Sequence, residues 1–214
     1  MDRRWFSASL TLALWASLAC MLPPPVVQQR SYASAKAFLG KVAVAPFVLG
    51  ARLRTDVSAG TATEGDAGPL VERVVAEELA ARGIGVIPAR DVKIAFTREG
   101  MKEPRTDPKA GAAIVFENFG ATAMLLGEVS RFRERVGGLR GATGPASVAF
   151  VVTLHAAPSG KKLWSARFDE TQVSLSAAPG RARRYPGGGG RWLTAPELAR
   201  FGARAAAEAL VSSP

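Results

Sequence analysis

The chain has 214 residues, and 28 basic against 18 acidic side chains give it a formal net charge of +10. Its single cysteine excludes an intramolecular disulfide, so the fold has to be held together by its core, for which the length is sufficient. The sequence contains one histidine, no His/Cys cluster with zinc spacing and no calcium-loop pattern. We therefore expect a protein without a metal or a cofactor.

The first residues have the pattern of a secretory signal peptide. Two arginines precede an uncharged, largely apolar stretch at residues 5–19, in which Ser17 and Ala19 are the small residues that a signal peptidase recognises. The stretch is shorter than the ~20 residues that cross a bilayer, and a proline triplet at residues 23–25 follows it. The sequence thus predicts export, with residues 1–19 removed as a signal peptide.

Cys20, which directly follows this stretch, is the only cysteine of the chain. In this feature the chain resembles a bacterial lipoprotein precursor, in which the cysteine is lipidated on sulfur, becomes the new N-terminus and is acylated on its amine. The resemblance implies a palmitate-type lipid anchor on Cys20. Because Met21 is not the aspartate associated with inner-membrane retention, it also implies the outer membrane, facing the periplasm. Ordinary cleavage, which would leave a free thiol and a soluble periplasmic or secreted protein, is the alternative.

Residues 20–39 are predicted to be the lipidated N-terminus and a tether. They contain the proline triplet, Gln28–Gln29 and few large apolar groups, a composition typical of an extended, semi-rigid linker. We expect this linker to hold the folded part away from the membrane. Residues 40–214 are predicted to form a single domain.

The first half of this domain shows a strand, a helix, a second strand and two further helices. Residues 41–49 are a near-continuous apolar run that suits a buried strand, in which Pro46 favours an edge or a bulge. A helix is predicted with Pro69 in its first turn, Leu79 on its inner face and Gly83 at its end. The remaining elements are a polar loop at 51–68, a short strand at 84–87, one or two helical turns at 89–96, and a helix from 107 to 120 with Ala112, Val115, Phe116 and Phe119 inward.

Strands dominate the second half. Residues 121–135 end in strict alternation, and residues 148–156 and 161–172 are strand-like runs joined by a turn sequence. The glycine-rich segment at 174–191 is predicted to be mobile. Thr194 and Glu197 form a capping box that begins a final helix, with an expected inner stripe of Leu198, Phe201, Ala205 and Ala209. The order predicts a single mixed α/β (α+β) domain, with a mixed sheet that ends in an antiparallel meander, helices packed on it and a closing C-terminal helix.

The order of these pieces resembles that of a small α/β domain of the bacterial envelope. The pieces that carry the resemblance are KVAVAPF at 41–47, LAARG at 79–83, IPARD at 87–91, GATAMLLGEV at 120–129 and SGKKLW at 159–164. The pattern is similar to the domain shared by the N-terminal region of TolB, the curli-secretion lipoprotein CsgG and the penicillin-binding-protein activator LpoB. The resemblance covers about residues 41–210. It implies a non-enzymatic domain that binds partners or assembles into larger complexes, and it assigns no functional residues.

Arginine side chains gather in two places. Alternation puts three of them on one face of the strand at 121–135, and the segment around 174–191 holds four near two aromatic residues. The seven candidates for anionic-ligand binding are Arg131, Arg133, Arg135, Arg181, Arg183, Arg184 and Arg191. Several guanidinium groups on one loop suit phosphate or carboxylate, so we expect an anionic envelope component such as a lipid headgroup, lipopolysaccharide or peptidoglycan. A solvated basic surface without a ligand is the alternative.

Catalytic constellations do not occur in the sequence. His155 lies in an apolar alternating strand with no nucleophile at a recognisable spacing, and the adjacent Asp169 and Glu170 point to opposite faces of what we expect to be a solvated strand end. No nucleic-acid-binding signature occurs, so nucleic acid is not an expected partner. The sequence favours a non-catalytic binding or assembly module that serves an outer-membrane or cell-wall complex. A hydrolase acting on cell-wall or lipid material is the alternative.

Overall fold

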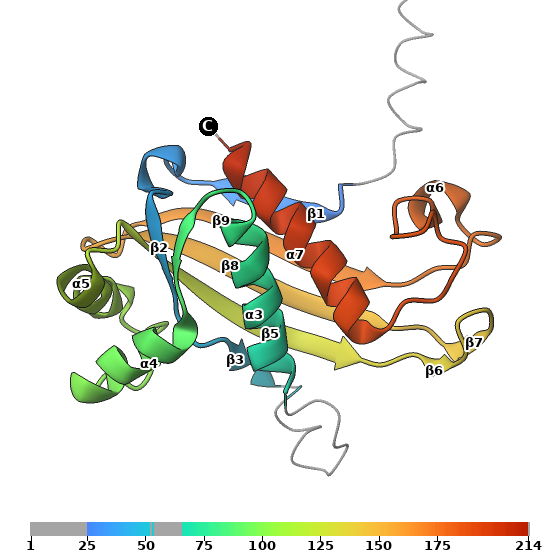
Figure 1. Ribbon diagram of the computed structural model, residues 1–214, viewed down its shortest axis with the longest axis horizontal. Coiled ribbons are helices and arrows are strands. Elements are labelled where there is room, and N and C mark those ends of the chain that lie inside the picture. The colour runs from blue at the N-terminus through green and yellow to red at the C-terminus, as the bar shows by residue number, and fades with distance from the viewer. Residues whose placement is uncertain (1–24, 52, 54–65, 214) are drawn as a thin grey trace, which may run out of the picture.

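The structure, a computed structural model, describes residues 25–51, 53 and 66–213. The predicted signal peptide, Cys20 and residues 54–65 of the predicted loop lie outside the described residues. In the part of the chain that the structure describes, no helix is long and apolar enough to span a membrane. The predicted fold class is confirmed, because one mixed sheet carries the helices and the last element is a C-terminal helix (Figure 1).

A seven-stranded mixed sheet forms the centre of the domain (Figure 1). Its strands lie in the order β1, β9, β8, β5, β2 and β4, and β3 pairs with the second half of β5. The bounds are β1 Val27–Ser31, β2 Lys41–Val44, β3 Val48–Leu49, β4 Gly85–Ile87, β5 Ala123–Arg133, β8 Ser147–Ala156 and β9 Lys162–Thr171. The parallel pairs are β2 with β4, β2 with β5 and β3 with β5, whereas β5, β8, β9 and β1 pair antiparallel and contain the predicted meander. A separate hairpin of β6 (Val136–Gly137) and β7 (Ala142–Gly144) follows β5.

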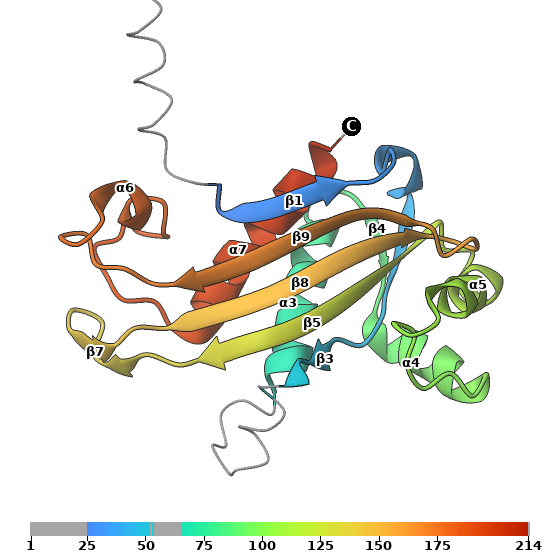
Figure 2. The same ribbon diagram turned by 180° about the vertical axis from the view of Figure 1, so that it is seen from behind.

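Helices cover the two faces of the sheet unequally. α3 (Ala67–Ala80) and α7 (Ala195–Val211) lie across one face and close the main core. α4 (Ala89–Arg98) and α5 (Pro108–Phe119) cover the other face only at the end near β2, over a smaller core. Figure 2 shows the rest of that second face, across β1, β9, β8 and β5, with none of the described helices on it. The described part of the chain also contains the short helices η1 (Lys36–Phe38) and α6 (Pro179–Ala182).

The tether prediction is wrong for residues 27–31. This stretch forms β1, an edge strand that pairs with β9 along its whole length. Val27 is buried, and the Gln29 Oε1 atom accepts a hydrogen bond from the Trp164 indole (2.9 Å). The sequence does not reveal this strand, because an edge strand is held by backbone pairing with one neighbour and needs few apolar residues. The folded domain therefore begins before residue 40.

Pro46 divides the predicted first strand into β2 and β3. Proline lacks an amide proton, so it interrupts the pairing, as the sequence predicts. Phe47 then turns inward and packs on Gly127 of β5, where a Cβ atom would clash with the ring. The backbone amide of Phe47 donates a hydrogen bond to Glu72 of α3 (3.0 Å), which ties this crossing to the helix.

The ends of α5 agree with the prediction, whereas its inner face agrees in part. The Asp107 side chain accepts a hydrogen bond from Ala110 N (3.0 Å), and Gly120 ends the helix in the left-handed conformation (φ 63°). Val115 is buried as expected. Phe116, however, is 46% exposed, so its predicted place in the core is wrong. α5 covers only the margin of the sheet, and the helix is therefore buried along a narrower stripe than its apolar residues predict.

The final helix begins at the predicted capping box of Thr194 and Glu197. Its buried stripe differs from the predicted one. Leu198 is buried as expected, whereas Phe201, Ala205 and Ala209 are half-buried at the border of the stripe. The buried positions are mostly small: Ala195, Ala199, Gly202, Ala203, Ala206 and Ala207, with Leu210. Small side chains let the helix approach the sheet closely, so the size of a side chain alone misplaces the inner face.

Candidate functional site

The helix-free part of the second sheet face carries mostly polar and cationic side chains. Along β9, alternation turns every second residue to this face and buries the residues between them. The strand register then aligns Arg131, Ala149 and Asp169 side by side across β5, β8 and β9. We call this surface the open face; its members are Gln28, Arg30, Glu128, Arg131, Arg133, Ser147, Ala149, Val151, Thr153, Ser165, Arg167, Asp169 and Thr171.

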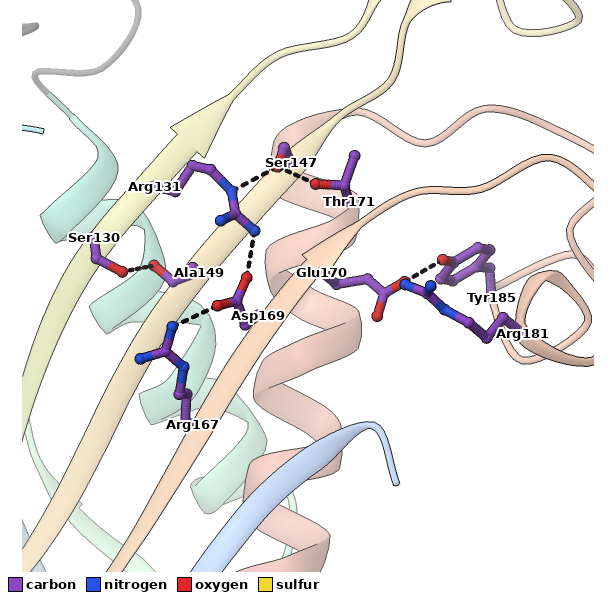
Figure 3. A network of polar contacts seen from close by, with 10 residues as sticks. All are labelled: Ser130, Arg131, Ser147, Ala149, Arg167, Asp169, Glu170, Thr171, Arg181 and Tyr185. Carbon is purple, nitrogen blue, oxygen red and sulfur yellow. Dashed lines mark hydrogen bonds and ion pairs between the residues drawn. The ribbon is translucent and has the colours of Figure 1, made fainter. Parts of the chain in front are cut away.

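Asp169 lies at the centre of a chain of polar contacts on the open face (Figure 3). Its two carboxylate oxygens accept hydrogen bonds from Arg131 and Arg167, each at 2.5 Å. The Nε of Arg131 donates to the Ser147 hydroxyl (2.6 Å), which also bonds to the hydroxyl of Thr171 (2.6 Å). Five side chains from three strands therefore hold one another in place, and the surface is ordered before any ligand arrives.

The network keeps a positive charge because one carboxylate serves two guanidinium groups. Partial burial raises the pKa of Asp169, but the hydrogen bonds and charges of Arg167 and Arg131 outweigh that effect and hold this pKa below its usual value. Asp169 is therefore ionised at neutral pH. One positive charge is left over for an anionic group of a ligand.

A β-bulge in β5 brings Arg131 into this network. The register with β8 shifts at Ser130, which lies opposite no residue of its own in β8. After the shift, Arg131 and Arg133 lie on the open face, as alternation predicts. Arg135 does not join them, because β5 has ended and its guanidinium donates to the backbone oxygen of Trp192 (2.5 Å).

The glycine-rich segment that follows β9 folds back against the sheet. It contains α6 and a series of turns, and Ala182 and Tyr185 belong to the main core. The ring of Tyr185 packs edge-on against Phe201 of α7, with 5.6 Å between the centroids. Composition alone did not predict this aromatic contact. We call residues 173–192 the α6 segment.

Glu170, on the core side of β9, is buried beneath the α6 segment. It points away from Asp169, as predicted, but it is only 7% exposed. The predicted solvated strand end therefore holds for Asp169, which is exposed, and is wrong for Glu170. Its Oε1 atom accepts hydrogen bonds from Arg181 and from the Tyr185 hydroxyl, both at 2.5 Å (Figure 3). Burial and the hydrogen bond to Glu170 raise the pKa of Tyr185 above its ordinary value. Arg181 is thus held by a buried carboxylate.

A hollow of about 220 Å³ lies between the start of β1 and the α6 segment. β1 begins opposite Phe168, so β9 continues beyond it with an edge that β1 does not pair. The lining consists of Pro25, Val26, Gln28, Arg167, Asp169, Glu170, Arg181 and Arg184. The hollow joins the open face to the α6 segment and places the first described residues of the chain beside three arginines.

The seven arginines predicted from the sequence do not form one site. They lie on the open face (Arg131, Arg133), at the hollow (Arg181, Arg184), exposed on the α6 segment (Arg183) and next to α7 (Arg135, Arg191). Arg191 pairs with Glu197, the capping-box residue of α7 (2.8 Å). Arg167, which completes the network of the open face, was not among the residues predicted from the sequence. Arg167 lies two residues before Asp169, so strand alternation predicts that both side chains lie on the same face.

His155 is a packed imidazole. It is 8% exposed, its Nδ1 atom lies 2.8 Å from the backbone oxygen of Gly160, and burial lowers its pKa. The sheet separates the carboxylates of Asp169 and Glu170, which do not converge. Among the residues that the structure describes, no group of three His, Cys, Asp or Glu side chains could hold a metal ion.

A second hollow, of about 480 Å³, lies between the β6–β7 hairpin and the α6 segment. Arg140 from the hairpin and Leu175, Arg191 and Trp192 from the α6 segment are among its lining residues. The Trp192 amide donates a hydrogen bond to the backbone oxygen of Leu139 (2.9 Å). The hairpin and the α6 segment therefore form one end of the molecule, which we call the α6 end.

No family model matches the chain, and no curated protein matches it. Solved structures with a similar fold include a PelC dodecamer from Paraburkholderia phytofirmans, which is 24% identical over 72% of this chain and 89% of that chain, with a TM-score of 0.42. Lipoprotein GNA1162 from Neisseria meningitidis is 21% identical over 63% of this chain and 82% of that chain, with a TM-score of 0.38. The LpoB C-terminal domain from Escherichia coli is 16% identical over 63% of this chain and 84% of that chain, with a TM-score of 0.39. These similarities concern the fold alone.

Proposed function

We propose that this chain is a lipid-anchored, non-catalytic binding module of the bacterial envelope, which docks a protein of an outer-membrane or cell-wall complex on its open face. The open face carries the proposal. It spans four antiparallel strands, none of the described helices covers it, and Arg131, Arg167 and Asp169 are bonded to one another on it (Figure 2, Figure 3).

An antiparallel sheet can also turn one face to water with no partner. One feature of this face favours a partner. The guanidinium groups outnumber the carboxylate that holds them, so the ordered surface has hydrogen-bond donors with a fixed direction to offer an acidic partner.

The chemistry of the open face supports binding rather than bond cleavage. Its ionisable groups are arginines, the ionised Asp169 and Glu128, which pairs with Arg105 (2.7 Å). The only histidine of the chain is buried, and its Nδ1 atom is occupied by a backbone contact. A hydrolase needs a nucleophile and a base, or two carboxylates, that converge on one bond. Asp169 and Glu170 lie on opposite faces of the sheet and cannot converge. Export and lipidation at Cys20 rest on the sequence, since both concern residues outside the described part.

Site-specific photo-crosslinking in intact cells tests this proposal. A photoreactive residue is placed at Ser165 or Arg133 on the open face and, as a matched control, at Arg73 or Ala80 on the exposed side of α3. We expect the open-face positions to yield a discrete crosslinked protein band and the α3 positions to yield none. Equal crosslinking from both faces, or crosslinking from α3 alone, would refute docking on the open face.

A further inference from the structure

We propose that the α6 end of the domain rests on the anionic lipid headgroups of the membrane that holds the anchor. This proposal rests on the lipid anchor at Cys20 in the proposed function, and it adds which part of the domain contacts the membrane. It names the ligand of the α6 segment as a lipid surface and fixes which end of the domain faces that surface.

The length of the chain before β1 brings the α6 end to the membrane. Pro25 lines the same hollow as Arg181 and Arg184, and the start of β1 lies beside α6 in both views (Figure 1, Figure 2). Pro25 is the fifth residue after Cys20. Five residues reach no more than about 18 Å even when they are fully extended. The lipidated cysteine therefore lies within this distance of the hollow, and the domain cannot stand far from the bilayer.

The charge of the α6 end matches an anionic surface. Residues 171–196, which include the whole α6 segment, contain four arginines and no Asp or Glu, and residues 135–168, which include the hairpin, contain no Asp or Glu either. Two of the four arginines, Arg181 and Arg191, pair with Glu170 and Glu197 just outside this range. Arg183 and Arg140 are both exposed. Basic groups this close to a bilayer are attracted by anionic headgroups, and the attraction is strong within about 10 Å, the range over which salt leaves charges unscreened.

The α6 end also exposes apolar side chains. Seven large apolar residues are exposed in the described part of the chain, and three of them lie here: Val136 (63%), Leu139 (52%) and Leu175 (41%). Exposed apolar groups interspersed with arginines are typical of surfaces that enter the headgroup region of a membrane. The end with α4 and α5, at the other end of the sheet, then points away from the bilayer (Figure 1).

Fluorescence quenching by lipids tests the orientation. The lipidated protein is purified from membranes and reconstituted into vesicles of phosphatidylcholine and phosphatidylglycerol that contain brominated acyl chains. A single added cysteine carries the fluorophore, at Ala177 in the α6 segment or, as the control, at the exposed Asn118 of α5. We expect strong quenching at position 177 and little at position 118. Equal quenching at the two positions would overturn the proposal.

Charge reversal tests the lipid contact itself. The double variant Arg140→Glu/Arg183→Glu should abolish the difference between the two labels, whereas the matched variant Arg98→Glu/Lys102→Glu, near the end of α4, should leave it unchanged. A difference that survives the first variant, or that disappears in the second one as well, would contradict a headgroup contact at the α6 end. Circular dichroism of each variant shows whether it is folded.

The intact mass of the same sample separates this inference from the proposed function. If Cys20 carries no lipid, the anchor is refuted, and the contact is tested on the unlipidated protein by flotation with anionic vesicles. Binding that falls at least about tenfold in the Arg140→Glu/Arg183→Glu variant would still support the lipid surface. Absence of binding would overturn it. If Cys20 is lipidated and the labels do not differ, the anchor stands and the orientation is wrong.

Discussion

Gly202 of α7 lies directly against the ring of Phe168 of β9. A Cβ atom at position 202 would approach two carbon atoms of the ring to 2.6 Å. Phe168 in turn packs on Phe150 of the neighbouring strand, with 5.2 Å between the ring centroids. The glycine therefore sets the distance between the C-terminal helix and the sheet, at the point where β9 carries its buried aromatic residues.

Replacing this glycine should destabilise the domain. We expect Gly202→Ala to lower the free energy of unfolding by about 1–3 kcal/mol through overpacking, although alanine favours a helix by about 1 kcal/mol. Urea denaturation measures the change. Gly180→Ala in α6 is the matched control, since a Cβ atom there meets nothing within 4 Å. If Gly202→Ala were as stable as the wild type, the packing of α7 would be wrong.

The buried phenol of Tyr185 should make stability depend on alkaline pH. Its raised pKa means that the folded state favours the protonated phenol. The stabilisation is therefore complete below the unfolded pKa of about 10 and is lost as the pH rises above that value towards the folded pKa. We expect the difference in unfolding free energy between the wild type and Tyr185→Phe to shrink above about pH 10.

Tyr32 provides the control for this prediction, because it is the only other tyrosine of the chain and is 50% exposed. Hydrogen bonds with Ser165 and Lys162 lower its pKa. An absorbance titration should therefore show two separated phenol steps, and Tyr185→Phe should remove the one at higher pH. A wild-type protein with both phenols titrating together would show that Tyr185 is not buried on Glu170.

The ion pairs of Asp169 should contribute little to stability and should vanish in acid. A double-mutant cycle with Arg131→Ala and Asp169→Ala is expected to give a coupling energy of about 0.2–1 kcal/mol, because the pair is partly exposed. The lowered pKa of Asp169 favours the charged form in the folded state. The coupling is therefore present above the unfolded pKa of about 3.9 and is lost as the pH falls through the folded pKa. A coupling energy that is independent of pH would contradict the network.

The buried face of α3 and the exposed face of α5 should respond differently to truncation. Leu79 is 2% exposed and Phe116 is 46% exposed. Leu79→Ala should cost about 2–5 kcal/mol, and Phe116→Ala should stay within about 1 kcal/mol of the wild type. Thermal unfolding followed by circular dichroism compares the two. Similar losses for both variants would mean that α5 is covered by something the structure does not contain.

Much of the fold could be predicted from sequence because local signals and tertiary packing agree. The apolar period of α3, the cap and terminal glycine of α5, and the capping box of α7 all lie where the sequence places them. The inner stripe of α7 could not be predicted, because close packing against β9 selects Gly202 and small neighbours over Phe201. Propensity and size describe one element at a time, whereas this choice depends on the sheet opposite.

The candidate site was predictable only where it depends on local sequence. Alternation placed Arg131 and Arg133 on one face, but neither the bulge at Ser130 nor the bond to Asp169 has a local signature. β1 was missed because residues 27–31 gain their stability from pairing with β9, not from their own composition. That strand shortens the chain between Cys20 and the folded domain, and the proposed orientation on the membrane depends on it.

The central claim is that a lipid on Cys20 anchors a domain that begins a few residues later. The intact mass of the protein purified from the membrane fraction tests this claim most directly. We expect a chain that starts at Cys20 and carries a glycerol with two acyl chains on sulfur and a third acyl chain on the amine, and a Cys20→Ser variant that lacks this added mass. A wild-type protein recovered in the soluble fraction with an unmodified Cys20 thiol would contradict the account.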